Sequence, residues 1–154
     1  MKKSDLFQLL HNLREVAHYP GAKFAYIVAK NIKLLTDECT LIEKSNVLSD
    51  EFKEYESKRS ALASSFADKN EDGSPKSENN KYVLSAEAHK EFEKELAKIN
   101  IEYKEPLEAY EKHLNEFTAL LNEESDVVLF KLKEESLPAN ITGAQVLSII
   151  NIIE

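Results

Sequence analysis

Apolar residues recur every three or four positions through a long stretch that contains neither Gly nor Pro. The stretch follows Pro20-Gly21, and its spacing places the apolar side chains on one face of an α-helix. The pattern predicts one continuous helix over residues 22–67, about 68 Å long. The rhythm is interrupted between Ile42 and Leu48, and Ser49 is a good N-cap, so a split into two helices is the alternative. This face comprises Phe24, Ile27, Val28, Leu35, Cys39, Ile42, Leu48, Phe52, Tyr55, Leu62 and Phe66.

A second apolar seam runs through residues 85–122 with nearly the seven-residue repeat of a coiled coil. Ser85 is a good N-cap, and Pro106 inside the seam predicts a kink or a division of the helix. Two long helices joined by a turn-rich loop predict a mainly α fold. We expect a single elongated domain over residues 1–154, organised as an antiparallel, coiled-coil-like helical hairpin. The seam comprises Phe92, Leu96, Ile99, Tyr103, Leu107, Tyr110, Leu114, Phe117 and Leu121.

Four shorter segments complete the predicted architecture. Residues 1–19 form an amphipathic N-terminal helix that Pro20-Gly21 ends. Residues 68–84 form a loop and a short strand, and residues 126–132 have the composition of a second strand. These two strands are expected to pair as a minor β ribbon, either within one chain or across a dimer. Residues 142–154 form an apolar C-terminal helix.

The C-terminal helix begins with a capping box, because Gln145 stands three residues after Thr142. It is apolar on nearly every side, so it must be buried by the rest of the chain or by another subunit. We therefore predict a homo-oligomer. The expected oligomer contacts are Val146, Leu147, Ile149, Ile150 and Ile153.

The net charge of −8 argues against a general nucleic-acid-binding protein. The charge is uneven, since residues 1–35 carry +4 and residues 87–135 carry −7. A single cysteine, Cys39, indicates a reducing compartment, and no apolar window has the length of a membrane span. We expect no membrane partner, and a location in the host cytoplasm or in a virion.

No pattern in the chain predicts catalysis, a cofactor or a metal. The chain has 3 glycines and no glycine-rich phosphate loop, and nucleophile signatures are absent. Only one Glu-x-x-His pair occurs, at Glu15 and His18, whereas a di-metal bundle needs two. Residues 68–73 resemble the start of a calcium loop, but Asn79 stands where that loop needs an acid. The sequence predicts a non-enzymatic protein.

The first half of the long helix carries the residues that we single out as an interaction surface. Asn31 lies on the apolar face, where a buried amide fixes helix register or oligomer state, or else contacts a ligand. Lys23, Tyr26, Lys30 and Lys33 form a basic stripe with one aromatic residue on the opposite side. The stripe is either a solvated face or a surface for an anion or an acidic partner.

Several spaced motifs over residues 20–135 resemble a group of small uncharacterised proteins encoded by bacteriophages and prophages. The motifs are Lys23–Ile32, Ala67–Gly73, Asn80-Lys81-Tyr82 and Leu120–Glu124, followed by Val127-Val128-Leu129. The resemblance implies a viral origin and a cytoplasmic or virion location. That group has no known catalytic residues, so none is carried over to this chain.

Three functions follow from these observations as hypotheses. The first is an oligomeric, non-enzymatic phage protein that works by protein–protein contact, in virion assembly or against a host factor. The second is a module that binds a small anionic ligand, such as a nucleotide signal, at the stripe of Lys23, Tyr26 and Lys30. The third and weakest is an acidic mimic of nucleic acid.

Overall fold

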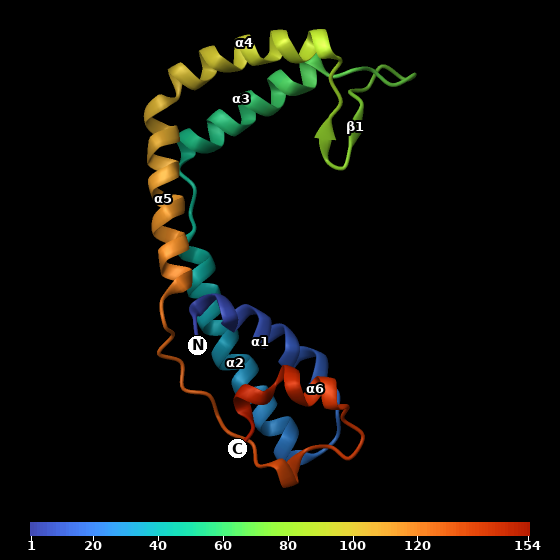
Figure 1. The fold of residues 1–154 in the computed structure, drawn as a ribbon, viewed down its shortest axis with the longest axis vertical. Coiled ribbons are helices and arrows are strands. Elements are labelled where there is room, and N and C mark those ends of the chain that lie inside the picture. The colour runs from blue at the N-terminus through green and yellow to red at the C-terminus, as the bar shows by residue number, and fades with distance from the viewer. The chain divides into compact units, whose positions relative to one another are not determined.

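The computed structural model describes all residues from Met1 to Glu154, and it confirms a mainly α-helical protein with six α-helices (Figure 1). The chain divides into two compact units rather than the single domain that the sequence predicts. Unit 1 comprises Met1–Val47 and Glu116–Glu154, and unit 2 comprises Leu48–Asn115. Each unit has its own apolar cluster.

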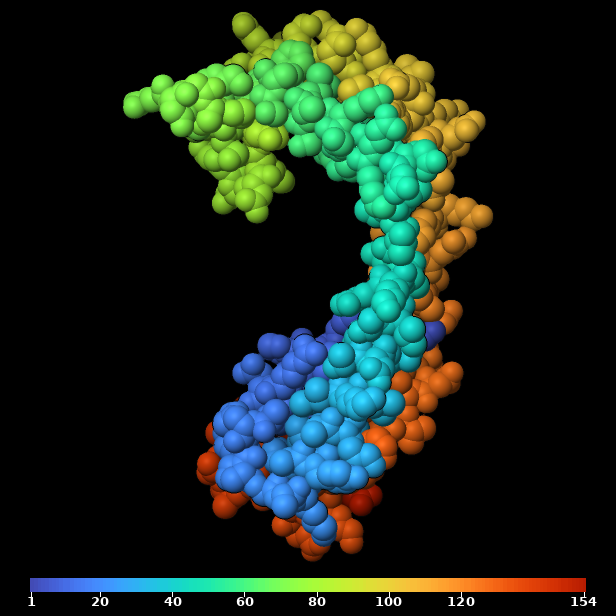
Figure 2. Space-filling view, turned by 180° about the vertical axis from the view of Figure 1, so that it is seen from behind, coloured from blue at the N-terminus to red at the C-terminus, as the bar shows by residue number.

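Unit 1 is built on α1 (Lys3–Val16) and α2 (Ala22–Ser45), which pack side by side (Figure 1). The space-filling view shows their blue residues and the orange and red C-terminal residues packed into one body (Figure 2). The buried cluster therefore joins both ends of the chain. Its members are Leu6, Leu9, Leu10, Leu13, Val16, Phe24, Val28, Leu35, Cys39, Ile42, Leu132, Ile149 and Ile152.

The turn between α1 and α2 confirms the predicted break at Pro20-Gly21. Gly21 has φ of +125°, a conformation that residues with a Cβ rarely adopt, so the chain reverses there at little cost. The N-terminal helix ends at Val16 and not at residue 19.

The predicted continuous helix over residues 22–67 is wrong, and the alternative split is observed. Residues 46–49 are not helical, and α3 begins at Asp50 and ends at Phe66. The Ser49 hydroxyl accepts a hydrogen bond of 3.1 Å from the backbone N–H of Phe52. This cap satisfies a backbone group that the start of a helix leaves without a partner, so it stabilises a new helix start.

Unit 2 contains α3, α4 (Ala86–Glu102) and most of α5 (Lys104–Asn122). α3 and α4 pack antiparallel (Figure 1), with Tyr55 near Asn100 and Phe66 near Phe92. The predicted division near Pro106 is confirmed, because the helix is interrupted at Tyr103. Proline has no N–H to donate to the carbonyl four residues earlier, which weakens the helix at this point.

Within the chain, the predicted ribbon between residues 82–84 and 126–132 does not form. The strand β2 (Lys81–Tyr82) pairs instead with β1 (Ser77–Glu78), directly before it in the chain. Asn79 and Asn80 form the tight turn, with φ of 50° and 60°. Asparagine tolerates this left-handed conformation better than most residues, so the local hairpin forms without a distant partner.

Residues 126–132 do not form the predicted strand, because no other strand lies beside them. Leu132 makes an isolated parallel bridge to Ile153, and the remainder of the segment lacks ladder pairing.

The predicted C-terminal helix over 142–154 is shorter in the structure. α6 covers Gly143–Ser148, and the one-turn 3-10 helix η2 covers Ile150–Ile152. The capping box is confirmed, since the Thr142 N–H donates to Gln145 at 3.0 Å. The helix does not continue to residue 154, because the backbone of residues 152–154 bonds to Leu132 instead. The Leu132 N–H donates to the Ile152 carbonyl at 2.6 Å, and the Glu154 N–H donates to the Leu132 carbonyl at 2.9 Å.

Candidate functional site: a basic and aromatic surface on unit 1

Asn31 is fully buried and binds the backbone of the segment 126–132. Its Oδ1 accepts a hydrogen bond of 2.9 Å from the Phe130 N–H, and its Nδ2 donates to the Phe130 carbonyl at 2.9 Å. Nδ2 also donates to the carbonyl of Ile27 at 3.1 Å. The amide thus makes to Phe130 the two hydrogen bonds that a neighbouring strand would make to one residue of an extended segment. The Asn31 amide is therefore satisfied within a single chain, by the extended segment and by its own helix.

The N-terminal residues bind the residues directly before the same segment, Glu123–Ser125. The Lys3 N–H donates to the Glu123 carbonyl at 2.9 Å, and the Ser125 N–H donates to the Met1 carbonyl at 2.9 Å. The Met1 ammonium group forms an ion pair with Glu124. These contacts and the Asn31 hydrogen bonds fix the segment along unit 1 at several points.

Lys30 joins the predicted basic stripe to this segment. Its Nζ lies 3.8 Å from the centre of the Phe130 ring and 5.3 Å from that of Tyr26, within the range of cation–π attraction. Lys33 forms an ion pair with Asp37 at 3.2 Å, while Lys23 is exposed in the first turn of α2. The stripe is therefore continuous with an aromatic residue that lies 100 positions later than Lys30 in the sequence.

The two rings beside Lys30 are partly exposed, and so is Val128, two residues before Phe130. Val128 is 82% exposed, Tyr26 is 62% exposed and Phe130 is 38% exposed. We call Tyr26, Lys30, Val128 and Phe130 the aromatic-basic surface. Phe130 and Val128 are absent from the sequence-based site, because only the three-dimensional contact of Phe130 with Lys30 connects their segment to it.

The predicted oligomer contacts of the C-terminal helix separate into two groups. Ile149 is completely buried in the core of unit 1, and Val146 and Ile153 are half-buried. Leu147 and Ile150 are 71% and 51% exposed. The unit itself therefore covers part of this apolar helix, and Leu147 and Ile150 are the members available to another subunit.

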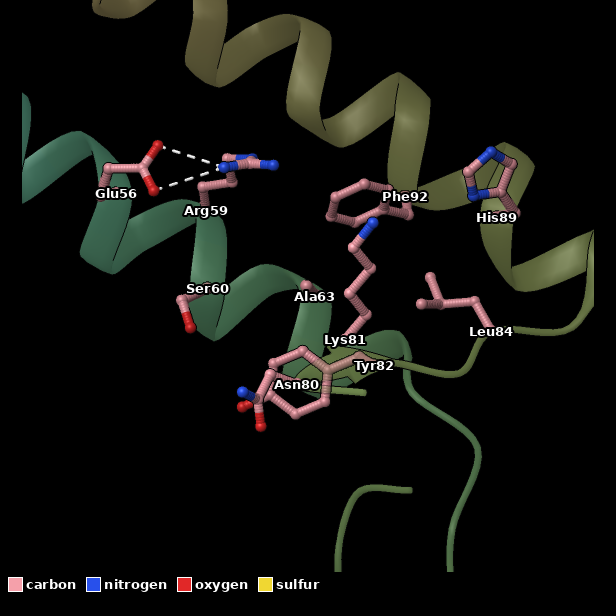
Figure 3. A pocket seen from close by; sticks show the side chains of 10 residues that line it. All are labelled: Glu56, Arg59, Ser60, Ala63, Asn80, Lys81, Tyr82, Leu84, His89 and Phe92. Atoms are coloured by element: carbon pink, nitrogen blue, oxygen red, sulfur yellow. Dashed lines mark hydrogen bonds and ion pairs between the residues drawn. The ribbon is translucent and has the colours of Figure 1, made fainter. Parts of the chain in front are cut away.

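Unit 2 contains a separate cleft of about 480 Å³ between α3, β2 and α4 (Figure 3). Arg59 lies on α3, Lys81 and Tyr82 on β2, and Phe92 on α4. Figure 3 shows the Lys81 side chain reaching from the hairpin towards the Phe92 ring. Sequence reasoning missed this site, since its residues come from three elements and share no spacing. The complete lining is Glu56, Arg59, Ser60, Ala63, Asn80, Lys81, Tyr82, Leu84, His89 and Phe92.

The chain has no cluster of three or more His, Cys, Asp or Glu side chains that could hold a metal ion. None of its helices combines the length and the apolar character needed to span a membrane. Comparison of the chain with family models, with curated proteins and with solved structures returned no match.

Cys39 is expected to react slowly with thiol reagents while the protein is folded. The side chain is 4% exposed, and burial is the main reason that its pKa is raised, with Glu43 and Glu38 adding to the effect. The thiolate is the reactive form, so both low access and a raised pKa slow the reaction. Labelling with a chromogenic disulfide at mildly alkaline pH should be at least about tenfold slower than in denaturant. Equal rates in the two conditions would contradict a buried Cys39.

Proposed function

We propose that the protein is a non-enzymatic, self-associating protein that acts by protein–protein contact through the aromatic-basic surface. The observation that carries the proposal is the 38% exposed Phe130 ring under the Lys30 ammonium group, with Val128, two residues earlier in the same segment, 82% exposed. Aromatic side chains are enriched in protein interfaces, and exposed apolar side chains that lie together mark interaction sites.

The hydrogen bonding of the segment supports an extended partner. Phe130 and Leu132 bond through their backbones to Asn31 and to the C-terminal residues, whereas Leu129 and Lys131 make no backbone hydrogen bond within the chain. An extended segment with free N–H and C=O groups is a template for strand addition. A second copy could supply such a strand.

The order of side chains in the segment suits pairing with a second copy. In an antiparallel pair centred on Leu129, Val128 of one copy would lie opposite Phe130 of the other. A pair of an aromatic and a β-branched residue is favourable in this arrangement. Such an interface uses the same patch on both copies and closes as a two-fold dimer.

Multi-angle light scattering tests self-association directly. We expect the wild-type protein at micromolar concentration to have a mass above that of one chain. The substitution Val128→Asp should return it to the monomer, because a carboxylate would then face the apolar patch of the other copy. The fold should be retained, since Val128 is 82% exposed.

Leu41→Asp is the matched control, because Leu41 is 63% exposed on α2 and outside the aromatic-basic surface. We expect this variant to associate like the wild type. A wild-type protein that stays monomeric would refute the proposed function. Equal loss of association in V128D and L41D would refute the assignment of the surface.

The biological setting stays a prediction. A phage origin, with a role in virion assembly or against a host factor, rests on the sequence resemblance alone. Structural genes beside the coding sequence would favour assembly, and early genes would favour action on the host. Anion binding at Lys23, Tyr26 and Lys30 and mimicry of nucleic acid stay alternatives, and a charge of −8 diluted by 20 basic residues argues against the latter.

A further inference from the structure

The cleft of unit 2 is basic, although the unit around it is acidic. Unit 2 carries 16 Asp and Glu against 11 Lys and Arg, a formal charge of −5. The cleft is lined by Arg59, Lys81 and His89, and its only carboxylate is Glu56. A concave site with the opposite sign to its surroundings concentrates anions.

Lys81 is the cation of the cleft that has no carboxylate partner. The other basic side chains near it have carboxylate partners, Arg59 with Glu56, Lys76 with Glu78, and His89 with Glu93. The hairpin β1–β2 positions Lys81, and the side chain extends into the cleft towards Phe92 (Figure 3). Its ammonium group is therefore available to an anion.

Two aromatic rings line the same cleft. Tyr82 is 37% exposed, and Phe92 packs at 6.4 Å between ring centres with both Phe66 and His89. The support from Phe66 and His89 fixes the orientation of the Phe92 ring, so it can act as a stacking surface for a planar group. A volume of about 480 Å³ lies within the range of small-molecule sites.

We propose that this cleft binds a small ligand composed of an aromatic ring and a phosphate, of the size of a nucleoside monophosphate. Lys81 and Arg59 would contact the phosphate, and Ser60 and Asn80 supply further hydrogen-bond donors in the same lining. Tyr82 and Phe92 would contact the ring. The site shares no residue with the aromatic-basic surface, so it does not depend on the proposed self-association.

Glu56 supplies a sharp test, because it competes with the phosphate for Arg59. Both of its carboxylate oxygens lie within 3.3 Å of the Arg59 guanidinium. The substitution Glu56→Gln removes the negative charge and releases Arg59. It should therefore tighten ligand binding severalfold, an effect that a merely structural role would not produce.

The experiment is isothermal titration calorimetry of the full chain with adenosine 5′-monophosphate. Lys81→Ala should weaken binding about tenfold or more, as expected for the loss of one charge-assisted contact. Lys90→Ala is the matched control, because it removes the same charge from an exposed position of α4 outside the cleft. The melting temperature of each variant without ligand verifies that the fold is unchanged.

Three further ligands show which part of the monophosphate the cleft recognises. Adenosine and inorganic phosphate should each bind more weakly than the monophosphate, and an aromatic carboxylate reports whether phosphate is required. Equal binding of adenosine would refute the anion site, and equal binding of inorganic phosphate would refute the aromatic part. A carboxylate that binds as tightly as the monophosphate would refute phosphate as the preferred anion. No binding of the monophosphate at millimolar concentration, or equal weakening by K81A and K90A, would refute the proposal as a whole.

Discussion

Replacing Asn31 with Leu is expected to lower the free energy of unfolding by about 3 kcal/mol. Leu has the same branching and the same number of side-chain heavy atoms as Asn, and a high helix propensity, so the change removes hydrogen bonds with little effect on side-chain shape or on α2. The N–H and C=O groups of Phe130 would lose their partners beside a fully buried position. Each buried group without a partner costs about 1–3 kcal/mol.

Two measurements separate this effect from general destabilisation. Urea unfolding followed by circular dichroism gives the change in stability, and amide hydrogen exchange reports on the Phe130 N–H itself. In Asn31→Leu we expect the Phe130 N–H to exchange by local opening, without unfolding of unit 1 as a whole. The same experiment shows whether the segment 126–132 detaches from α2.

Asn122→Leu is the matched control for the loss of an amide. Asn122 is exposed and donates to the Thr118 carbonyl at 2.9 Å within its own helix. This substitution should cost less than about 1 kcal/mol, because water can replace the lost bonds. A similar cost for Asn31→Leu and Asn122→Leu would contradict the role assigned to Asn31.

The helical periodicity predicted most of the fold, because burial of one helix face is a local property of the sequence. The cores of α1 and α2, the division near Pro106 and the capping box at Thr142 all follow from spacing and cap chemistry. For residues 46–49 the sequence supports two predictions. The continuing apolar face favours one long helix, and Ser49 favours the start of a new helix. The structure has the new helix, capped by the hydrogen bond to Ser49. The strength of that bond cannot be predicted from residue spacing alone.

The segment 126–132 shows where sequence reasoning stops. Its composition is typical of a strand, but a strand needs a partner, and composition does not say which element supplies it. The side chain of Asn31, 99 residues before Phe130, takes that place. The basic stripe could be predicted because its residues share one helix, whereas Phe130 joins it through a long-range contact.

The second large effect is expected from Ile149→Ala. Ile149 has no exposed surface and packs in the core of unit 1 with Leu132 and Ile152. Truncation of a buried Ile to Ala costs about 2–5 kcal/mol, because the lost contacts leave a cavity. The variant should unfold at clearly lower urea concentration, with loss of far-ultraviolet circular dichroism as the measurement.

Leu147→Ala separates the two roles that an apolar C-terminal helix can have. Leu147 lies on the same helix α6 but is 71% exposed, so its truncation should change the stability of the folded chain by less than about 0.5 kcal/mol. If α6 contributes to the oligomer, L147A should instead reduce the mass measured by light scattering. A loss of stability as large as that of I149A would mean that Leu147 is buried in the protein in solution. In that case a second subunit, rather than the chain itself, covers the outer face of α6.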